Sequence, residues 1–446
     1  MIRLLILALM VSALPLLGAW PAVLLAIYAL AFIPYFALLP TRESHSAISW
    51  TWLLGAALLV RIWLVFWPPI LSDDLFRYVW EGRVFVAGLN PFVLAPNADE
   101  LAFLRDSEIW PSINHSHIPT IYPPVAQFVF GLNALFDGGT TSLRLIFVAF
   151  ELILTGLIVK ELPALRRYQF CLIYLLNPLV ITELAWSGHL DALAYLSALW
   201  GLLLWLNRRS VVFVGLVLGL SISTKFLGVM ALALILLTPG RSLGQKAWVA
   251  LVSVTTVGAT YLPFAEAGPD LLAGFGTYAA SWRSNDIFFR AIYSLSETVL
   301  TLPDGQKVVF DLPQGSLASD QISATLGKAF AVLAMSCAFV WSVTVIRRPA
   351  QGFLLLMGTL LLFAPTVHPW YVAWLVPFAA VAEKPEDTPM ARAALIWSTS
   401  VILAYLAWLS YGNGGAWHTP SWAAWVQGGL VLFALATTRA KPHLNS

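Results

Sequence analysis

The run Trp67-Pro68-Pro69 ends an apolar stretch, and the segment Ser72-Asp73-Asp74-Leu75-Phe76-Arg77-Tyr78-Val79-Trp80-Glu81-Gly82-Arg83 follows almost at once. Six ionisable side chains therefore stand at the mouth of a predicted membrane helix. Ionisable groups in lipid cost free energy and usually face a cavity or a partner. The pattern predicts a membrane-embedded reaction site rather than a solvated loop.

Composition indicates the class of protein around this segment. The chain has 446 residues, of which 59% are hydrophobic and only 11% are charged. An average soluble domain has roughly 25% charged residues. The apolar residues come in blocks of about 17 to 25 residues, the length that spans a bilayer. We therefore predict an all-α, polytopic integral membrane protein that forms a single domain over residues 1–446, and no basic tract indicates a nucleic-acid partner.

The apolar blocks predict 12 to 14 transmembrane helices. Two regions need a special arrangement: residues 122–136 are too short for a full crossing, so we expect a half-embedded helix there. Residues 211–238 run between two basic loops, so the chain must cross twice or turn back near Lys225. The remaining spans are expected near 2–18, 20–40, 50–68, 142–160, 168–184, 190–206, 247–264, 326–346, 352–366, 371–382, 393–410 and 421–438.

The distribution of Arg and Lys predicts the orientation, because short cytoplasmic loops are rich in these residues. The basic loops contain Arg42, Arg166, Arg167, Arg208, Arg209, Arg241, Lys246, Arg347, Arg348, Lys384, Arg392, Arg439 and Lys441. Two long polar segments remain, at about 69–121 and 265–325, and each has seven acidic and three basic residues. We expect both to face outward, toward the periplasm if the source is Gram-negative.

The adjacent carboxylates of Asp73 and Asp74 are the candidate catalytic groups. A carboxylate at the water–lipid boundary can take a proton from an attacking hydroxyl, and two neighbouring carboxylates raise each other's affinity for a proton. A leaving phosphate would need cations, since negative charge develops on it. Arg77, Lys225 and Arg283 are the candidates for that role. The alternative is that Asp74–Arg77 and Glu81–Arg83 are ion pairs that stabilise a short amphipathic helix.

Other polar residues are expected at span ends on the same outward side. Glu183 precedes the segment Ser187-Gly188-His189-Leu190-Asp191, and His368-Pro369-Trp370-Tyr371 separates two later spans. The set predicted to bind substrate is Tyr78, Glu81, Arg83, His115, Tyr122, Glu183, His189, Asp191, His368 and Tyr371. No spacing among them is a specific metal-ligand signature. We therefore predict no cofactor and no metal ligands, and leave a divalent metal ion open.

Taken together, these motifs resemble one enzyme family. The chain resembles the polyprenyl-phosphate-sugar-dependent glycosyltransferases of the GT-C class, in particular a bacterial mannosyltransferase-like branch related to the GPI mannosyltransferases. The resemblance extends over about residues 70–377. It rests on the segment 73–83, Gly88-Leu89-Asn90-Pro91-Phe92, Ile113-Asn114-His115, Thr120-Ile121-Tyr122-Pro123-Pro124, Asn177-Pro178, Gly188-His189-Leu190-Asp191, Lys225, Trp282-Arg283-Ser284-Asn285-Asp286 and His368-Pro369-Trp370-Tyr371.

The resemblance implies a multi-span enzyme that moves a hexose, with mannose expected, from a polyprenyl phosphate to a hydroxyl acceptor on the outer face. It implies inversion at the sugar carbon and an aspartate base, and it leaves Asp73 and Asp74 open, with Asp74 favoured. Where relatives carry Asp before Gly-Arg, this chain has Glu81, which keeps the charge and lengthens the reach.

The expected partners follow from this reaction. They are the lipid-linked sugar donor, a glycolipid, glycan or other hydroxyl acceptor, and the lipids of a bacterial inner membrane. The alternative function is a flippase or transporter of lipid-linked sugars without transferase chemistry, since intramembrane charges also serve transport.

Overall fold

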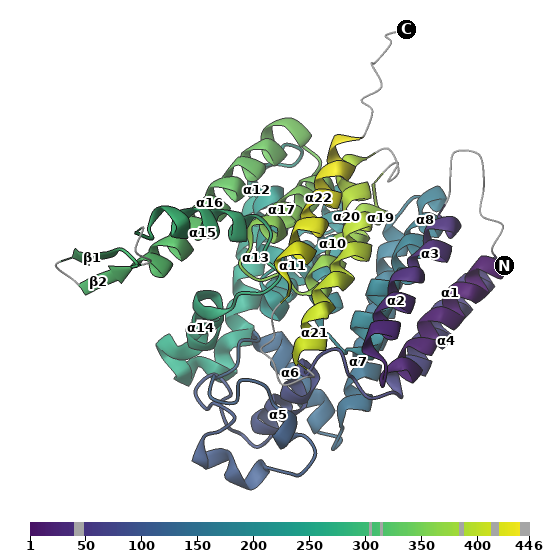
Figure 1. Cartoon of the computed structure of the whole chain (residues 1–446). Coiled ribbons are helices and arrows are strands. Elements are labelled where there is room, and N and C mark those ends of the chain that lie inside the picture. The colour runs from purple at the N-terminus through teal and green to yellow at the C-terminus, as the bar shows by residue number, and fades with distance from the viewer. Residues whose placement is uncertain (40–48, 303–305, 313–314, 383–387, 412–418, 438–446) are drawn as a thin grey trace.

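The structure is a computed structural model, which describes residues 1–39, 49–302, 306–312, 315–382, 388–411 and 419–437. Four of the basic loop residues, Arg42, Lys384, Arg439 and Lys441, lie outside the described residues. The described chain is a bundle of helices with one short β-hairpin (Figure 1). The prediction of an all-α, polytopic membrane protein is confirmed.

The N-terminal part of the chain, up to residue 237, forms twelve α-helices in the described residues. They are α1 (Ile2–Ala13), α2 (Pro21–Leu30), α3 (Phe32–Leu38), α4 (Trp50–Val65), α5 (Asp74–Val86), α6 (Pro124–Ala134), α7 (Thr140–Glu161), α8 (Ala164–Leu175), α9 (Pro178–Ile181), α10 (Asp191–Leu206), α11 (Val211–Lys225) and α12 (Gly228–Leu237).

The C-terminal part adds further helices and the hairpin. These are α13 (Leu243–Tyr261), α14 (Ala273–Ser281), α15 (Phe288–Val299), β1 (Val309–Leu312), β2 (Gly315–Ala318), α16 (Ser319–Trp341), α17 (Pro349–Phe363), α18 (Pro369–Ala373), α19 (Leu375–Ala380), α20 (Pro389–Ser400), α21 (Leu406–Tyr411) and α22 (Ser421–Ala436). Short 3-10 or π-helical pieces join them: η1 (Leu14–Leu17), η2 (Asp99–Leu104), η3 (Trp110–Ser112), η4 (Thr182–Trp186), η5 (Leu262–Leu272), η6 (Ser342–Ile346) and η7 (Val401–Tyr405).

Helix length separates complete spans from interrupted ones. Among the described residues, five helices are long and apolar enough to cross a bilayer, or six if the bent pair 166–175 and 178–186 is one span. Seven shorter apolar helices accompany them. Breaks and bends divide several of the predicted spans into these shorter pieces, so the number of crossings stays a prediction.

The chain turns back at Lys225. Helix α11 ends there, Phe226 takes a left-handed backbone conformation with φ of +57°, and α12 begins at Gly228. A Cβ atom on Gly228 would lie 2.7 Å from the carbonyl oxygen of Leu218, so the two helices pack backbone to backbone. The turn brings a lysine deep into the chain's fold, at a helix C-terminus where a cation is favoured.

Helix α10 lies at the centre of the bundle. It is apolar on all sides and buried over nearly its whole length, as expected for a helix surrounded by others. It packs against α7, α11 and α12. Its first residue, Asp191, is therefore buried between neighbouring helices at one end of the bundle.

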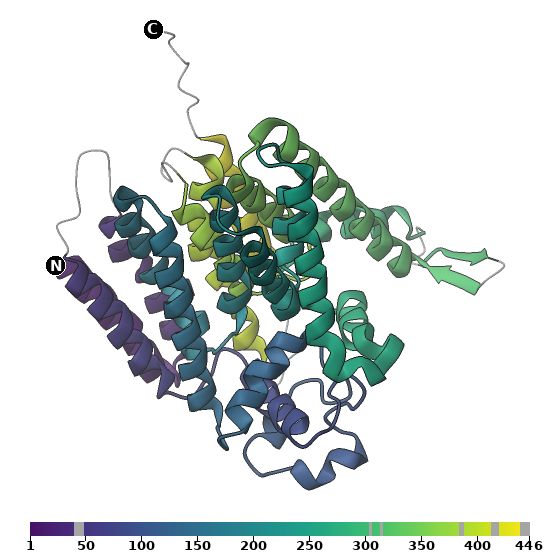
Figure 2. The same ribbon diagram turned by 180° about the vertical axis from the view of Figure 1, so that it is seen from behind.

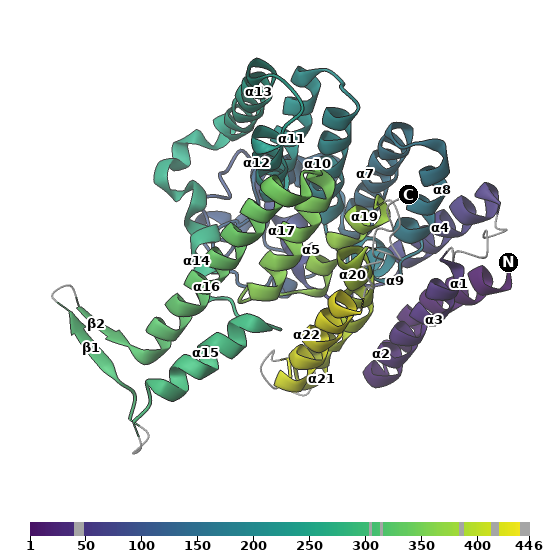
Figure 3. The same ribbon diagram turned by 90° about the horizontal axis from the view of Figure 1, so that it is seen from above.

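The two segments predicted to face outward meet at that end. Figure 1 shows α5 and α6 together below the bundle, with α14 beside them, and the view from behind in Figure 2 agrees. A Cβ atom on Gly82 would lie 2.3 Å from the carbonyl oxygen of Phe130, so α5 and α6 are in backbone contact. Seen from above, the hairpin projects away from the other helices at one end of α15 and α16, while α16 also packs against α17 (Figure 3).

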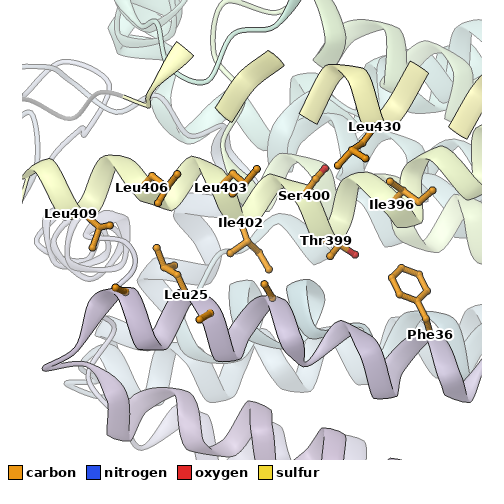
Figure 4. Close-up of a pocket in the computed structure, with 13 residues that line it drawn as sticks. Leu25, Phe36, Ile396, Thr399, Ser400, Ile402, Leu403, Leu406, Leu409 and Leu430 are labelled. Carbon is orange, nitrogen blue, oxygen red and sulfur yellow. The ribbon is translucent and has the colours of Figure 1, made fainter. Parts of the chain in front are cut away.

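A large apolar groove lies elsewhere, between α2 and α3 on one side and α20, η7 and α22 on the other (Figure 4). Its volume is about 550 Å³, and its lining contains no ionisable side chain. Such a lining suits hydrocarbon rather than a sugar or a phosphate. The polar groups that could carry out chemistry on a sugar phosphate lie elsewhere, at the end of the bundle that holds Asp191.

Candidate active site

The turn before α5 is anchored to the start of the α10 region. Arg144 is buried and donates hydrogen bonds from Nη1 to the carbonyl oxygens of Trp67, at 2.6 Å, and Trp186, at 3.0 Å. The indole Nε1 of Trp186 donates to the carbonyl oxygen of Pro68, at 2.7 Å. These three bonds fix the segment that carries Asp73 and Asp74 against η4.

A tight turn then delivers His189 to the same place. Gly188 has φ of +78°, a conformation that costs glycine little and other residues more. A Cβ atom there would lie 2.8 Å from Cγ of Arg144 and 3.0 Å from the side chain of Leu75. Only glycine allows the loop to approach α5 this closely.

The two aspartates share one amide. Nδ2 of Asn114 donates to Oδ1 of Asp73, at 2.7 Å, and to Oδ1 of Asp74, at 2.9 Å. Asp73 is exposed, whereas the side chain of Asp74 is only 21% exposed and its Oδ2 lies 3.9 Å from Nδ1 of His189. Asp74 is thus the carboxylate that faces the protein interior.

Burial distinguishes the two aspartates electrostatically as well. Desolvation, and then the charge of Asp73, raise the pKa of Asp74 from 3.8 to about 6. A carboxyl group with such a pKa is ionised at neutral pH and holds a proton better than an ordinary aspartate. That property suits a general base.

His189 continues the polar cluster inward. Its Nε2 lies 3.6 Å from Oε2 of Glu183, and both side chains are fully buried. The ring of His189 stacks on the indole of Trp370 with centroids 3.8 Å apart. The ring of His368 stacks on the same indole with centroids 4.3 Å apart. Glu183 lies on η4, a π-helical turn of the kind often found at functional sites.

Lys225 forms the cationic side of the site. Its Nζ donates to Oδ1 of Asp191 at 2.7 Å, and Nε1 of Trp374 donates to the same oxygen at 2.6 Å. The ammonium lies 5.2 Å from the ring centroid of Tyr371, within the range of a cation–π contact. The side chain of Lys225 is 17% exposed, so its ammonium is held in place but accessible.

Aromatic side chains join the second acidic segment to this cluster. The hydroxyl groups of Tyr371 and Tyr278 are 2.7 Å apart. The ring of Tyr278 contacts Trp282, whose indole packs edge-on against His115 with centroids 4.4 Å apart. His115 is exposed, so it lies at the outer rim of the site rather than beside the base.

The alternative prediction of ion pairs Asp74–Arg77 and Glu81–Arg83 is wrong, because both arginines have other partners. Arg77 pairs with Glu81, with Nε 2.8 Å from Oε1, and Arg83 pairs with Asp106. Glu81 is buried and also accepts hydrogen bonds from Thr120 and Gln127, each at 2.7 Å. A buried carboxylate needs such partners, whereas Asp74, at the first turn of α5, lies near His189 and pairs with neither arginine.

This network changes the roles expected for Arg77 and Glu81. The guanidinium of Arg77 also donates to the carbonyl oxygens of His115 and Ile118, so its donors hold the loop that carries Asn114. Glu81 and Arg77 therefore support the site by holding the loop that carries Asn114. Each guanidinium nitrogen of Arg77 already donates within the protein, which argues against a role for Arg77 in holding the donor phosphate.

Among the remaining predicted residues, Tyr78 and Tyr122 lie near Asp74, whereas Arg283 is paired elsewhere. Tyr78 and Tyr122 are buried and pack on each other with ring centroids 4.9 Å apart, and burial together with nearby charges that include Asp74 raises the pKa of both hydroxyl groups. Arg283 pairs with Asp286, at 2.6 Å, and lies over the ring of Tyr293 on α15. The structure therefore gathers one group around the base: Asp73, Asp74, Tyr78, Tyr122, Glu183, His189, Asp191, Lys225, His368 and Tyr371.

Several residues that contact this group had no assigned role in the sequence. Asn114 belongs to a motif quoted above, and its amide side chain was a usable signal; Trp374 lies three residues after the motif His368–Tyr371. Tyr28 and Tyr405 donate to Oε1 of Glu183, at 3.5 Å and 2.8 Å, from positions 155 and 222 residues away in sequence. No pattern in the sequence marks contacts of that range. Among the described residues, no three His, Cys, Asp or Glu side chains come together in a way that would hold a metal ion.

Comparison with known families gives one match that covers more than half of the chain. A family described as "Alpha-(1->6)-mannopyranosyltransferase, N-terminal domain" matches residues 3–241. The matched region includes Asp73, Asp74, His189, Asp191 and Lys225.

Two mycobacterial proteins are similar over most of the chain. A probable alpha-(1->6)-mannopyranosyltransferase of Mycolicibacterium smegmatis is 24% identical over an alignment of 391 residues that covers 77% of this chain and 66% of that protein. Alpha-(1->6)-mannopyranosyltransferase A of Mycobacterium tuberculosis is 26% identical over an alignment of 341 residues that covers 70% of this chain and 61% of that protein. The chain thus spans less than two thirds of the length of either relative.

Proposed function

The chain belongs to the alpha-(1->6)-mannopyranosyltransferase family that matches residues 3–241, and on that premise we propose that it transfers mannose from a polyprenyl-phosphate donor to a hydroxyl acceptor. The observation that carries this proposal is the position of Asp74. Its carboxylate lies at the open side of a buried cluster that also holds Lys225, so a base and a cation face one site.

Asp74 serves as the general base in this proposal. It takes the proton of the acceptor hydroxyl while that oxygen forms a bond to C1 of the mannosyl group. The bond from C1 to the phosphate oxygen breaks, and its electron pair leaves with the polyprenyl phosphate. A single displacement of this kind inverts the configuration at C1. Asp74 is preferred over Asp73 because Asp74 faces the cluster and has the raised pKa.

Lys225 is the group proposed to hold the leaving phosphate. An ammonium carries three N–H donors, and one of them binds Asp191. The remaining donors are free to meet the phosphate oxygens on which negative charge develops, where a positioned cation stabilises the transition state most. Trp374 and Tyr371 hold the lysine in this place.

The outer rim is proposed to receive the acceptor, a glycolipid or a glycan, on the periplasmic side of a bacterial membrane. Two observations support this side. Both acidic segments, around α5 and α14, contribute to the rim through Asn114 and Tyr278. The basic loops lie elsewhere in the sequence, as expected for the cytoplasmic face.

The test uses purified protein in detergent, a mannosyl donor radiolabelled in the sugar, and a mannoside acceptor. Asp74→Asn should lower kcat by about 1,000-fold, because a general base contributes 10²–10⁴ in rate. The matched control is Asp99→Asn, an exposed aspartate in the same outward segment, which should transfer at the wild-type rate. Wild-type transfer by a folded Asp74→Asn variant would contradict the assignment, and no transfer by the wild type would favour a flippase.

A further inference from the structure

Three buried atoms next to Asp74 have no hydrogen-bond partner within the usual distance. They are Nδ1 and Nε2 of His189 and Oε2 of Glu183. Buried polar groups are almost always paired, so each exception needs a reason. These three atoms form a line: Nε2 faces Oε2 of Glu183 at 3.6 Å, and Nδ1 faces Oδ2 of Asp74 at 3.9 Å.

Glu183 is placed as a neutral acid would be. It is fully buried, and the donors to its Oε1 are the uncharged hydroxyl groups of Tyr28 and Tyr405. No lysine or arginine among the described residues forms an ion pair with it. A buried carboxylate without a cation loses its charge by keeping its proton. The proton then lies on the oxygen that faces His189.

We propose that Glu183 and His189 are positioning residues for the base, joined in one chain of hydrogen bonds. Protonated Oε2 of Glu183 donates to Nε2 of His189, and Nδ1–H of His189 donates to Oδ2 of Asp74. The inference rests on the proposed function, because these hydrogen bonds are proposed to orient the catalytic carboxylate of Asp74.

The geometry supports a chain that tightens when substrate binds. The stack on Trp370 fixes the plane of the His189 ring, so both of its nitrogens stay directed at the two carboxyl groups. Catalytic hydrogen bonds are often long in the free enzyme and shorten in the complex with substrate. The chain fixes one tautomer of His189, much as a hydrogen-bonded acid fixes a catalytic histidine. The two fully buried members of this chain, Glu183 and His189, are then both neutral.

Two substitutions at Glu183 separate a neutral donor from a charged partner. The amide of Glu183→Gln can still donate to Nε2 and accept from both tyrosines, so kcat should change by less than about threefold, whereas Glu183→Leu should lower kcat by about 100-fold through loss of orientation. KM for the donor should stay unchanged in both. If kcat falls as far in Glu183→Gln as in Glu183→Leu, the glutamate acts through its charge and the proposal is overturned.

Spectroscopy gives a readout that does not depend on activity. Wild type should show the infrared carbonyl band of a protonated, buried carboxyl group at neutral pH, and Glu183→Gln should lack it. Persistence of the same band in Glu183→Gln would overturn the protonation state proposed here.

A pair of substitutions at His189 tests the other link and covers the case in which Glu183→Leu does not fold. The amide nitrogen of His189→Asn takes the place of Nδ1, and that of His189→Gln takes the place of Nε2. The asparagine variant should therefore keep at least about tenfold more activity than the glutamine variant. Equal loss in two variants with wild-type melting temperatures would overturn the link.

The pH profile adds a measurement that a merely structural role would not move. The charged groups that act on Asp74 are Asp73, Asp191 and Lys225, and the other titratable side chains near it are His189, Tyr78, Tyr122 and Tyr278. Loss of the Nδ1–H donor disfavours the carboxylate, so the acid limb of kcat/KM should move to higher pH in His189→Gln and less in His189→Asn. An identical limb in both variants would count against the link.

The outcomes also separate this inference from the proposed function. If Asp74→Asn transfers sugar at the wild-type rate, Asp74 is not the base, and the hydrogen bonds from Glu183 and His189 then orient no catalytic group. If Asp74→Asn is inactive but Glu183→Gln fails like Glu183→Leu, the base stands and only the neutral chain is wrong.

Discussion

Two glutamates in the bundle are equally buried and differently paired. Glu151 on α7 receives two hydrogen bonds from Arg61 on α4, Nε to Oε2 and Nη2 to Oε1, each at 2.8 Å. The remaining guanidinium nitrogen donates to the carbonyl oxygens of Ala57 and Leu175. Glu183 has hydroxyl partners on one oxygen, while the other faces His189 beyond hydrogen-bond distance.

The difference teaches that burial alone does not mark a functional group in this fold. The Arg61–Glu151 pair is bidentate and uses its donors and acceptors within the protein, so nothing is left to meet a ligand. The Asp74 cluster keeps unpaired polar atoms and an accessible lysine. A closed pair holds helices together, and an open cluster retains polar groups for chemistry.

The largest expected effect breaks the closed pair. Arg61→Met leaves the carboxylate of Glu151 buried without a partner, which should lower the free energy of unfolding by about 3–5 kcal/mol. Unfolding in detergent, followed by circular dichroism, measures it. Adding Glu151→Leu removes the stranded charge and should restore most of the stability; a double variant as unstable as the single one would show that the pair itself stabilises the fold.

The next effect concerns the open cluster and should appear in activity rather than in stability. Lys225→Met should lower kcat by about 100- to 1,000-fold, the usual cost of removing one group that stabilises transition-state charge. Lys225→Arg keeps the charge and should lose less. The control is Lys160→Met, at an exposed position near the end of α7. Transfer by Lys225→Met at the wild-type rate would remove Lys225 from the site.

The pH dependence should sharpen the contrast between Asp73 and Asp74. Asp74 must be ionised to act as base, so activity should fall as pH drops through about 6. Asp73→Asn removes a negative neighbour, which lowers the pKa of Asp74 and should move this limb to lower pH by less than about one unit. The measurement is kcat/KM between pH 4.5 and 8. A limb that stays in place or rises would indicate that Asp73 does not act on Asp74.

The smallest effect is expected at the partly exposed pair Arg83–Asp106. Its side chains are 31% and 33% exposed, so water screens their attraction. Arg83→Gln should change the free energy of unfolding by about 0.2–1 kcal/mol and leave transfer intact. Chemical denaturation and the sugar-transfer assay measure the two quantities. A large loss of activity would return Arg83 to the set of substrate-binding residues.

The sequence predicted some site residues correctly and others wrongly, and each outcome has a physical cause. Asp73, Asp74, His189, Asp191 and Lys225 stood out because charge is rare in this chain, and the structure brings them together. Arg77, Glu81 and Arg83 stood out for the same reason, but they pair among themselves or with Asp106. Charge in an apolar chain predicts that a partner exists, and it does not predict which one.

The sequence by itself determined the helical membrane fold, the two acidic segments and the turn at Lys225. Length, apolar blocks and charge distribution are properties of the chain that need no neighbours. Only the tertiary structure decided that Asp74 rather than Asp73 faces His189, and that Glu183 meets Tyr28 and Tyr405. These contacts join residues more than 100 positions apart, and the packing of whole helices sets them.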